Sequence, residues 1–265
     1  MKVALFFDKS IEDNASVYYE KAKRAKRKLE GLKKAIESTE AKIKRFKEGK
    51  MAIEKEEAKR RQEAGRAKRV KKWYEKFRWF FSSEGFLCIG GRDATTNDII
   101  IKKYTDKDDL VFHTQIIGSP FFVVKSEGKE IGKATIEEAA EATAAYSRAW
   151  RQGLTSTEVY YIKPEQVKKE LGLPKGTFMI YGKRNYLRPA LRIAIGKTPE
   201  GIIGGPVSAV ASKTKNYFII TPGDKKVSEV LKLLSANFKE SPDEIQCFLP
   251  SGKYAVKQKI ENYIN

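Results

Sequence analysis

The chain has 265 residues, 41% of them hydrophobic, and a formal net charge of +19. This length accommodates one large or two ordinary domains, and so large a positive charge favours a polyanionic partner, nucleic acid before an anionic membrane. No stretch of 18 apolar residues occurs, and the apolar run at residues 3–7 is too short for a signal peptide. We therefore expect a cytoplasmic protein without a membrane span, in which Cys88 and Cys247 are free thiols.

The positive charge is concentrated in residues 20–72, where 22 Lys and Arg residues stand against 9 Asp and Glu. A charge that served only solubility would be spread evenly. Apolar residues recur at alternating steps of four and three from Tyr18 to Phe46, which is typical of a coiled-coil seam. Because such a seam needs a partner helix, we predict an antiparallel helical hairpin with a second arm at about 53–81. A single long helix that dimerises is the alternative.

Three aromatic residues, Trp73, Phe77 and Phe80, recur at steps of four and three near the end of the predicted second arm. On a helix these steps place the side chains on one face. We predict that at least two of them are buried where the coil meets a sheet.

After about residue 82 the pattern changes to short β-branched or aromatic runs separated by Gly, Asn and Asp, which is typical of strands. Helices are predicted at 135–153 and 225–238, with a further helical turn at 241–249. The predicted fold class is α+β: a long basic helical hairpin in residues 1–75, with a short N-terminal lead-in, then a globular domain in 76–265 with a mainly antiparallel sheet and flanking helices. The predicted strands are 86–91, 98–104, 110–115, 120–126, 158–164, 176–182, 191–197 and 216–223.

Few residues are suited to catalysis or metal binding. The chain has one histidine, His113, and its two cysteines are 159 residues apart, which excludes a multi-histidine metal site and a Cys/His zinc module. The Gly-rich stretch GIIGGP lacks both the P-loop Lys-Ser/Thr and the dinucleotide fingerprint. We interpret His113 as a hydrogen-bonding or RNA-stacking residue and predict no enzyme activity, metal or cofactor. A small hydrolase that uses His113 is the alternative.

Two turns carry cations suited to phosphate. Lys183, Arg184 and the amide of Asn185 lie on a tight turn that can clamp a phosphate. A solvated hairpin tip is the alternative. Arg92, in the run Gly-Gly-Arg-Asp, either reaches a phosphate or pairs with Asp93 or Asp98 to brace its turn.

The stretch WYEKFRWFFSSEGFLCIGGRDATTND, residues 73–98, closely resembles the opening signature of the NFACT-R domain in the NEMF/RqcH family, in its archaeal and eukaryotic form. Four further blocks resemble the family in the same order: VFHTQIIGSPFFVVK, AYSRAW, GTFMIYGKRNYL and GGPVSAV. Upstream, DNASVYYEKAKRAKRKLEGL resembles the start of the family's coiled coil. The resemblance thus covers nearly the whole chain.

Members of this family bind large ribosomal subunits that are obstructed by a peptidyl-tRNA, and they extend the stalled peptide without mRNA. The resemblance therefore implies rescue of stalled ribosomes, with tRNA, large-subunit rRNA and a protein of the ribosomal stalk base as partners. A basic coiled-coil adaptor for an acidic protein is the alternative. Some relatives carry a fibronectin-binding label, but the missing secretion signal counts against adhesion.

Two departures from the family pattern stand out. The family's N-terminal domain and helix-hairpin-helix module are absent, so we expect part of a larger protein, a naturally short member being the alternative. Ile117 replaces the second histidine of the family's His-x-x-x-His block. The residues predicted to bind RNA are Arg60, Arg61, Arg66, Lys68, Arg69, Arg92, His113, Lys125, Lys183, Arg184 and Asn185, and those predicted to hold the motif together are Trp73, Phe77, Phe80, Gly90, Gly91, Asp93 and Asn97.

Overall fold

The computed structural model describes residues 4, 8, 10–63 and 72–258, and the side chains beyond residue 40 of the long helix are described only at Ile43. The chain divides into two compact units, 1–70 and 71–265, and each is described by itself.

In the first unit, one helix, α1 (Ile11–Glu63), runs for 53 residues. It begins at Ser10, whose Oγ accepts a hydrogen bond of 3.0 Å from the Asp13 backbone N–H. The predicted hairpin is wrong, because α1 continues through Gly49 and residues 73–81 belong to the second unit. One glycine costs a helix only about 1 kcal/mol relative to alanine, and the Lys, Glu, Ala and Arg around it are strong helix formers.

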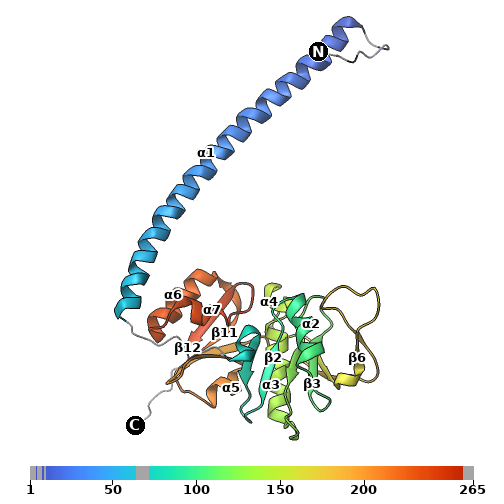
Figure 1. Ribbon diagram of the computed structural model, residues 1–265, viewed down its shortest axis with the longest axis vertical. Coiled ribbons are helices and arrows are strands. Elements are labelled where there is room, and N and C mark those ends of the chain that lie inside the picture. Colours follow the sequence, from blue (N-terminus) through green and yellow to red (C-terminus); the bar gives the residue numbers. More distant parts are fainter. Residues whose placement is uncertain (1–3, 5–7, 9, 64–71, 259–265) are drawn as a thin grey trace. The chain divides into compact units, whose positions relative to one another are not determined.

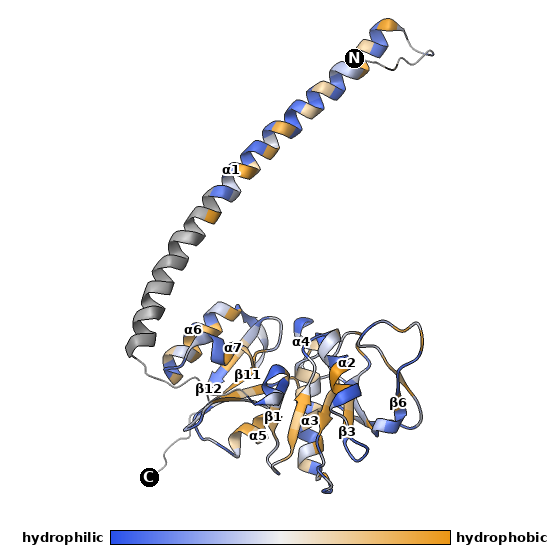
Figure 2. Ribbon diagram, viewed as in Figure 1, coloured by the Kyte–Doolittle hydropathy of each residue, from blue (hydrophilic) through white to orange (hydrophobic). Residues whose placement is uncertain are grey.

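The seam of α1 is exposed over the described part of the helix. Leu29, Leu32 and Ile36 are 54–57% exposed, and Figure 2 shows hydrophobic residues recurring along this helix between polar ones. The single long helix thus agrees with the alternative given above. Dimerisation through its seam stays a prediction.

The second unit contains two sheets and a two-stranded ribbon, and every strand pairing in them is antiparallel (Figure 1). The six-stranded sheet has the order β1-β2-β4-β3-β5-β8, the four-stranded sheet β10-β9-β11-β12, and the ribbon β6-β7. The α+β class with a mainly antiparallel sheet is confirmed. The strands are β1 (Arg78–Phe81), β2 (Leu87–Gly90), β3 (Leu110–Thr114), β4 (Phe122–Val124), β5 (Val159–Ile162), β6 (Val167–Lys168), β7 (Met179–Ile180), β8 (Asn185–Leu187), β9 (Ile193–Thr198), β10 (Gly201–Gly205), β11 (Tyr217–Lys225) and β12 (Tyr254–Gln258).

The helices of the second unit pack against its sheets, and α3 (Lys133–Ala145) contacts both the six-stranded and the four-stranded sheet. They are η1 (Trp73–Lys76), α2 (Ala94–Lys103), α3 (Lys133–Ala145), α4 (Arg148–Arg151), η2 (Pro164–Gln166), α5 (Val207–Ala211), α6 (Val227–Phe238) and α7 (Pro242–Gln246). The predicted helix 135–153 is divided, because α3 ends before Ser147, whose side chain accepts from the Ala149 N–H and starts α4.

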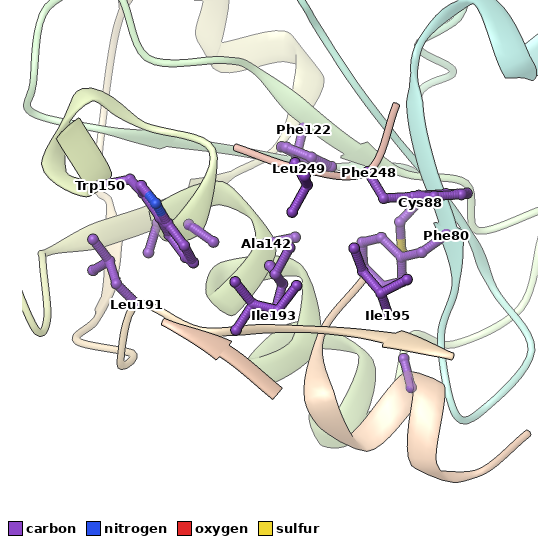
Figure 3. Close-up of a cluster of buried hydrophobic side chains, with 14 of the residues drawn as sticks. Phe80, Cys88, Phe122, Ala142, Trp150, Leu191, Ile193, Ile195, Phe248 and Leu249 are labelled. Atoms are coloured by element: carbon purple, nitrogen blue, oxygen red, sulfur yellow. The ribbon is translucent and has the colours of Figure 1, made fainter. Parts of the chain in front are cut away.

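The main core surrounds α3, which contacts β3, β4 and β5 of the larger sheet and β9 of the smaller one. The alanines at 139, 140, 142, 144 and 145 are fully buried, and their small side chains let the helix approach both sheets closely. Figure 3 shows Ala142 among Phe122, Ile193 and Leu249. A second core lies on the other face of the six-stranded sheet, where Ile100 of α2 packs with Ile89 and Val111.

The strand predicted at 98–104 is wrong, because these residues form most of α2. The Ile-Ile-Ile run favours a strand by propensity. However, Asp93 and Thr96 form a capping box at the helix start, and burial of Ile100 against the sheet stabilises the helix. Local capping and packing together outweigh the β-branched composition.

Two of the three aromatic residues at 73, 77 and 80 are buried, as predicted: Phe77 is 0% exposed and Phe80 4%, whereas Trp73 is 46% exposed. The helical reason for this prediction is wrong. Trp73 lies in η1, and Phe80 lies in β1 opposite Cys88 of β2. The location of these aromatic residues where the coil meets the sheet stays a prediction.

Candidate nucleic-acid interface

A cleft of about 470 Å³ opens at one end of the six-stranded sheet. The strand ends meet there because the strands are antiparallel: β1 begins at the cleft, β2 and β3 end at it, and β5 begins there again. The turns at 91–94, 113–121 and 175–184 contribute its walls. Three segments that are far apart in the sequence, and that contain three of the motifs singled out above, thus form one site.

The Gly90-Gly91 pair is required by close packing. A Cβ on Gly90 would lie 2.3 Å from the Phe122 ring, and one on Gly91 would lie 1.8 Å from Asn97 Oδ1. That same oxygen accepts a 3.1 Å hydrogen bond from the backbone N–H of Phe121. Asn97 therefore ties the start of α2 to the start of β4 and fixes one wall of the cleft.

Asp93 and Arg92 have separate roles at the next two positions. The Asp93 carboxylate accepts a 2.8 Å hydrogen bond from the Thr96 N–H, and this bond lowers the pKa of Asp93. Arg92 is exposed, and its guanidinium donates to the Phe77 carbonyl oxygen at 3.0 Å. Asp98 pairs with Lys102, so neither acid braces Arg92. The Arg92 guanidinium lines the cleft.

His113 lies in a row of aromatic side chains that the sheet register places on neighbouring strands. Its ring stacks on Phe121 at 4.2 Å, and it lies opposite Tyr160 of β5. Its Nε2 is 3.2 Å from the Ser119 carbonyl oxygen and its Nδ1 3.4 Å from the Tyr160 hydroxyl. Burial lowers the pKa of His113 to about 4. The imidazole is therefore neutral near pH 7, with Nε2–H donating to Ser119 and Nδ1 accepting from Tyr160.

Arg184 completes this side of the cleft. Its guanidinium lies 4.8 Å from the centre of the Tyr160 ring, in a cation–π contact. Tyr186 of β8 packs against the same ring, with 5.8 Å between ring centres. Burial raises the pKa of Tyr160 to about 12, so the hydroxyl keeps its proton.

Of the predicted RNA-binding residues, the cleft brings together Arg92, His113 and Arg184. Lys183 and Asn185 are exposed beside it but do not line it. Lys125 lies elsewhere: it is buried, and its ammonium group contacts Asp109, Asp106 at 2.7 Å and the Tyr104 carbonyl oxygen at 2.9 Å.

The predicted basic residues of the coil cannot be placed in a site. Arg60 and Arg61 belong to α1, but their side chains are not among those described. Arg66, Lys68 and Arg69 lie outside the described residues altogether.

Sequence reasoning missed two cations of the cleft, Arg78 and Lys175. Arg78 interrupts an aromatic run, and this cation among aromatic residues was the signal that could have drawn attention to it. With Arg92 and Arg184 the cleft has four cationic side chains, whereas the carboxylate of Asp93 is engaged with the start of α2. The site is therefore positively charged, with aromatic walls, and suits an anion that carries a flat ring.

Within the described residues, no three His, Cys, Asp or Glu side chains gather as a metal site would require. None of the helices that the structure describes has the length and hydropathy of a membrane span.

Comparison with known proteins agrees with a cleft that suits RNA. The family described as "NFACT protein RNA binding domain" matches residues 76–182, which carry most of the cleft. The "Archaeal Rqc2 homolog aRqcH" of Methanocaldococcus jannaschii is 40% identical over 204 residues, covering 72% of this chain and 30% of that protein. The "Ribosome quality control complex subunit NEMF" of Homo sapiens is 35% identical over 187 residues, covering 67% of this chain and 16% of that protein.

One solved structure, of "the C-terminal of the fibronectin/fibrinogen-binding protein from Streptococcus suis", aligns with a TM-score of 0.42 and 20% identity over 78% of this chain and 82% of that one. A likeness at this level says nothing about function. The chain spans less than a third of the length of the curated relatives named above. From the matched RNA-binding domain and these relatives, the chain belongs to the NEMF/RqcH family, in an archaeal-like form.

Proposed function

We propose that the second unit binds RNA through the cleft, as the RNA-binding part of a ribosome-associated quality-control factor. The observation that carries the proposal is the meeting of four cationic side chains with the row of Phe121, His113 and Tyr160. Cations that neutralise phosphates supply most of the affinity for RNA, and aromatic faces accept unstacked bases.

The RNAs we propose are tRNA and the rRNA of the large ribosomal subunit. The named relatives are quality-control proteins of the ribosome, and the charge of residues 20–72 would extend the basic surface beyond the cleft. In a family member of full length, this binding would support mRNA-independent tailing of stalled nascent chains. The coil would additionally contact a stalk-base protein.

Crosslinking to purified large ribosomal subunits tests the proposal. The chain is irradiated with subunits that carry a peptidyl-tRNA and with empty subunits, and crosslinked positions are mapped on rRNA and tRNA. We expect Arg184→Glu to lose crosslinks that the wild type makes. The matched control is Arg151→Glu, an exposed arginine that does not line the cleft, and it should retain them. If both variants crosslink like the wild type, the cleft is not the RNA site.

A protein adaptor is the second candidate, and the exposed seam of α1 favours it. Leu29, Leu32 and Ile36 are the side chains that a coiled coil buries, and the surrounding positive charge suits an acidic partner. Salt distinguishes the two candidates. RNA binding through about six to ten phosphates weakens by about three to five orders of magnitude between about 50 and 200 mM salt, whereas a protein partner held mainly by the apolar seam should lose far less affinity.

A further inference from the structure

Arg78 is a partly buried cation for which the described residues provide no carboxylate partner. Its guanidinium lies 4.2 Å from the centre of the Tyr146 ring, against which it stacks. Tyr146 is itself stacked on Phe122, with 5.9 Å between ring centres, and its hydroxyl donates to the Phe248 carbonyl oxygen at 2.7 Å. None of the ion pairs among the described residues includes Arg78.

Arg92, a second cation that lines the same cleft, acts on Arg78 with a charge of the same sign. Burial lowers the pKa of Arg78, Tyr146 partly offsets this effect, and the positive charge of Arg92 lowers the pKa further. An arginine nevertheless stays protonated in proteins. A buried cation beside a second cation is costly unless an anion compensates both, and both guanidinium groups line the same cleft.

The other end of the cleft is lined by side chains that suit a flat ring of a ligand. His113 and Tyr160 are held by each other and by Phe121, and Arg184 lies over Tyr160. The volume of about 470 Å³ lies within the range of about 300 to 1,000 Å³ that small-molecule sites occupy. A duplex presents its phosphates on the outside and keeps its bases stacked, so it cannot fill such a site with a base.

We propose that the cleft receives one unpaired nucleotide of the bound RNA, with its phosphate held by Arg78 and Arg92 and its base placed against the side formed by Arg184, Tyr160 and His113. This inference rests on the proposed function, because it specifies which part of an RNA enters the site. The fork of each guanidinium matches the oxygens of a phosphate, which a lysine ammonium does less well. The base needs no particular sequence, since every base has a stacking face.

The single histidine provides a direct measurement. Because His113 is the only histidine of the chain, its ring protons give unique NMR signals that need no assignment. We use adenosine monophosphate as the probe and titrate it against the full chain. We expect the His113 signals to shift in a saturable way, while adenosine alone and inorganic phosphate alone bind at least about tenfold more weakly, since each lacks one half of the ligand.

Substitutions locate the phosphate. Arg78→Gln and Arg92→Gln should each weaken binding of adenosine monophosphate about tenfold or more, as expected for loss of charge-assisted hydrogen bonds. Arg151→Gln should bind like the wild type. Circular dichroism checks that both variants stay folded, because Arg92 also donates to the Phe77 carbonyl oxygen, and Arg78→Lys tests whether the charge without the planar fork suffices. If both glutamine variants bind the nucleotide as tightly as the wild type, the assignment of the phosphate is wrong.

RNA oligonucleotides separate this inference from the proposed function. A single-stranded tetranucleotide should shift His113 and displace adenosine monophosphate, whereas a blunt duplex of the same sequence should not. If labelled tRNA binds the chain but neither the nucleotide nor the tetranucleotide shifts His113, the inference fails while the proposed function stands. If the duplex shifts His113 as strongly as the single strand, an unpaired nucleotide is not required. If no RNA binds, both proposals fail.

Discussion

Phe77 connects the core to the cleft. Its ring is fully buried and packs edge-on against Tyr104 at 5.4 Å, while its carbonyl oxygen accepts the hydrogen bond from Arg92. We expect Phe77→Ala to lower the free energy of unfolding by about 3 to 5 kcal/mol, because the change removes a buried ring and leaves a cavity. Urea denaturation followed by circular dichroism measures the loss.

Trp73→Ala serves as the control for Phe77. Trp73 stacks on Tyr104 with 4.8 Å between ring centres but is 46% exposed, so its removal should cost clearly less. An equal loss of unfolding free energy in the two variants would mean that the deeper burial of Phe77 adds nothing to its contribution to stability.

The stability of the chain should depend on the protonation of His113. Its pKa is about 4 in the folded protein and about 6.5 in an unfolded chain. The unfolded state therefore binds the proton more readily between these values. We expect stability to be fully present above about pH 6.5 and to fall as the pH drops towards 4, by at most about 3 kcal/mol from this residue.

His113→Asn isolates this contribution. The free energy of unfolding is measured at pH 7 and at pH 5 for both proteins, and the difference between the two pH values should be smaller in the variant. Carboxylates also titrate in acid, but they affect both proteins alike. A variant with the same pH dependence as the wild type would show that the imidazole is charged or exposed in the folded state.

At single residues, the sequence singled out Gly90, Gly91 and Asp93 as motif residues, but their reasons appear only in the fold. Gly90 lies against the Phe122 ring of the neighbouring strand, and Asp93 caps a helix that the sequence analysis assigned to a strand. The site residues were predictable only in part. Lys125 contacts Asp109 because strands β3 and β4 pair, and Arg78 faces the cleft because β1 forms a sheet edge. These pairings are not readable from residue types.

At the scale of elements, periodicity was ambiguous where it mattered most. Spacings of three and four, as from Trp73 to Phe80, indicate a helix, yet the aromatic composition of Arg78–Phe81 is equally typical of a strand. Residues 78–81 form a strand because β1 pairs with β2, and this contact forms only when the chain folds. The helix α2 illustrates the opposite case, since its cap was present in the sequence and its isoleucines were misleading.

The relative contributions of the coil and the globular unit to RNA binding can be measured. We expect simultaneous replacement of the coil cations by Glu to weaken binding more than Lys183→Glu with Arg184→Glu, because residues 20–72 carry most of the excess charge. Each lost phosphate contact should lower the salt slope by roughly one. Fluorescence anisotropy at two salt concentrations measures both effects. The coil cations to be replaced are Arg60, Arg61, Arg66, Lys68 and Arg69.

The opposite order of effects would be equally informative. If the coil variant binds RNA as well as the wild type while the Lys183/Arg184 variant fails, the RNA site belongs to the second unit alone. The charge of the coil would then serve another partner.

At the scale of the whole molecule, the two units have separate sources of stability. The second unit has its own buried cores on both faces of the six-stranded sheet, whereas the described seam of α1 is exposed. We expect residues 72–265 expressed alone to unfold cooperatively at the midpoint of the full chain, as measured by differential scanning calorimetry. A midpoint lower by 10 degrees or more, about the effect of losing a few kcal/mol, would show that the coil stabilises the second unit.

The alanines of α3 constrain how this domain can evolve. The helix lies between two sheets, and the residue after it, Tyr146, carries the ring on which Arg78 stacks. Any added methyl group must displace a sheet or the helix, at a typical cost of about 1 to 3 kcal/mol, and a shifted helix would carry Tyr146 with it. We therefore expect these buried positions to accept fewer replacements than the cleft's exposed rim, so that lineages could change their RNA preference there while the interior stays nearly invariant.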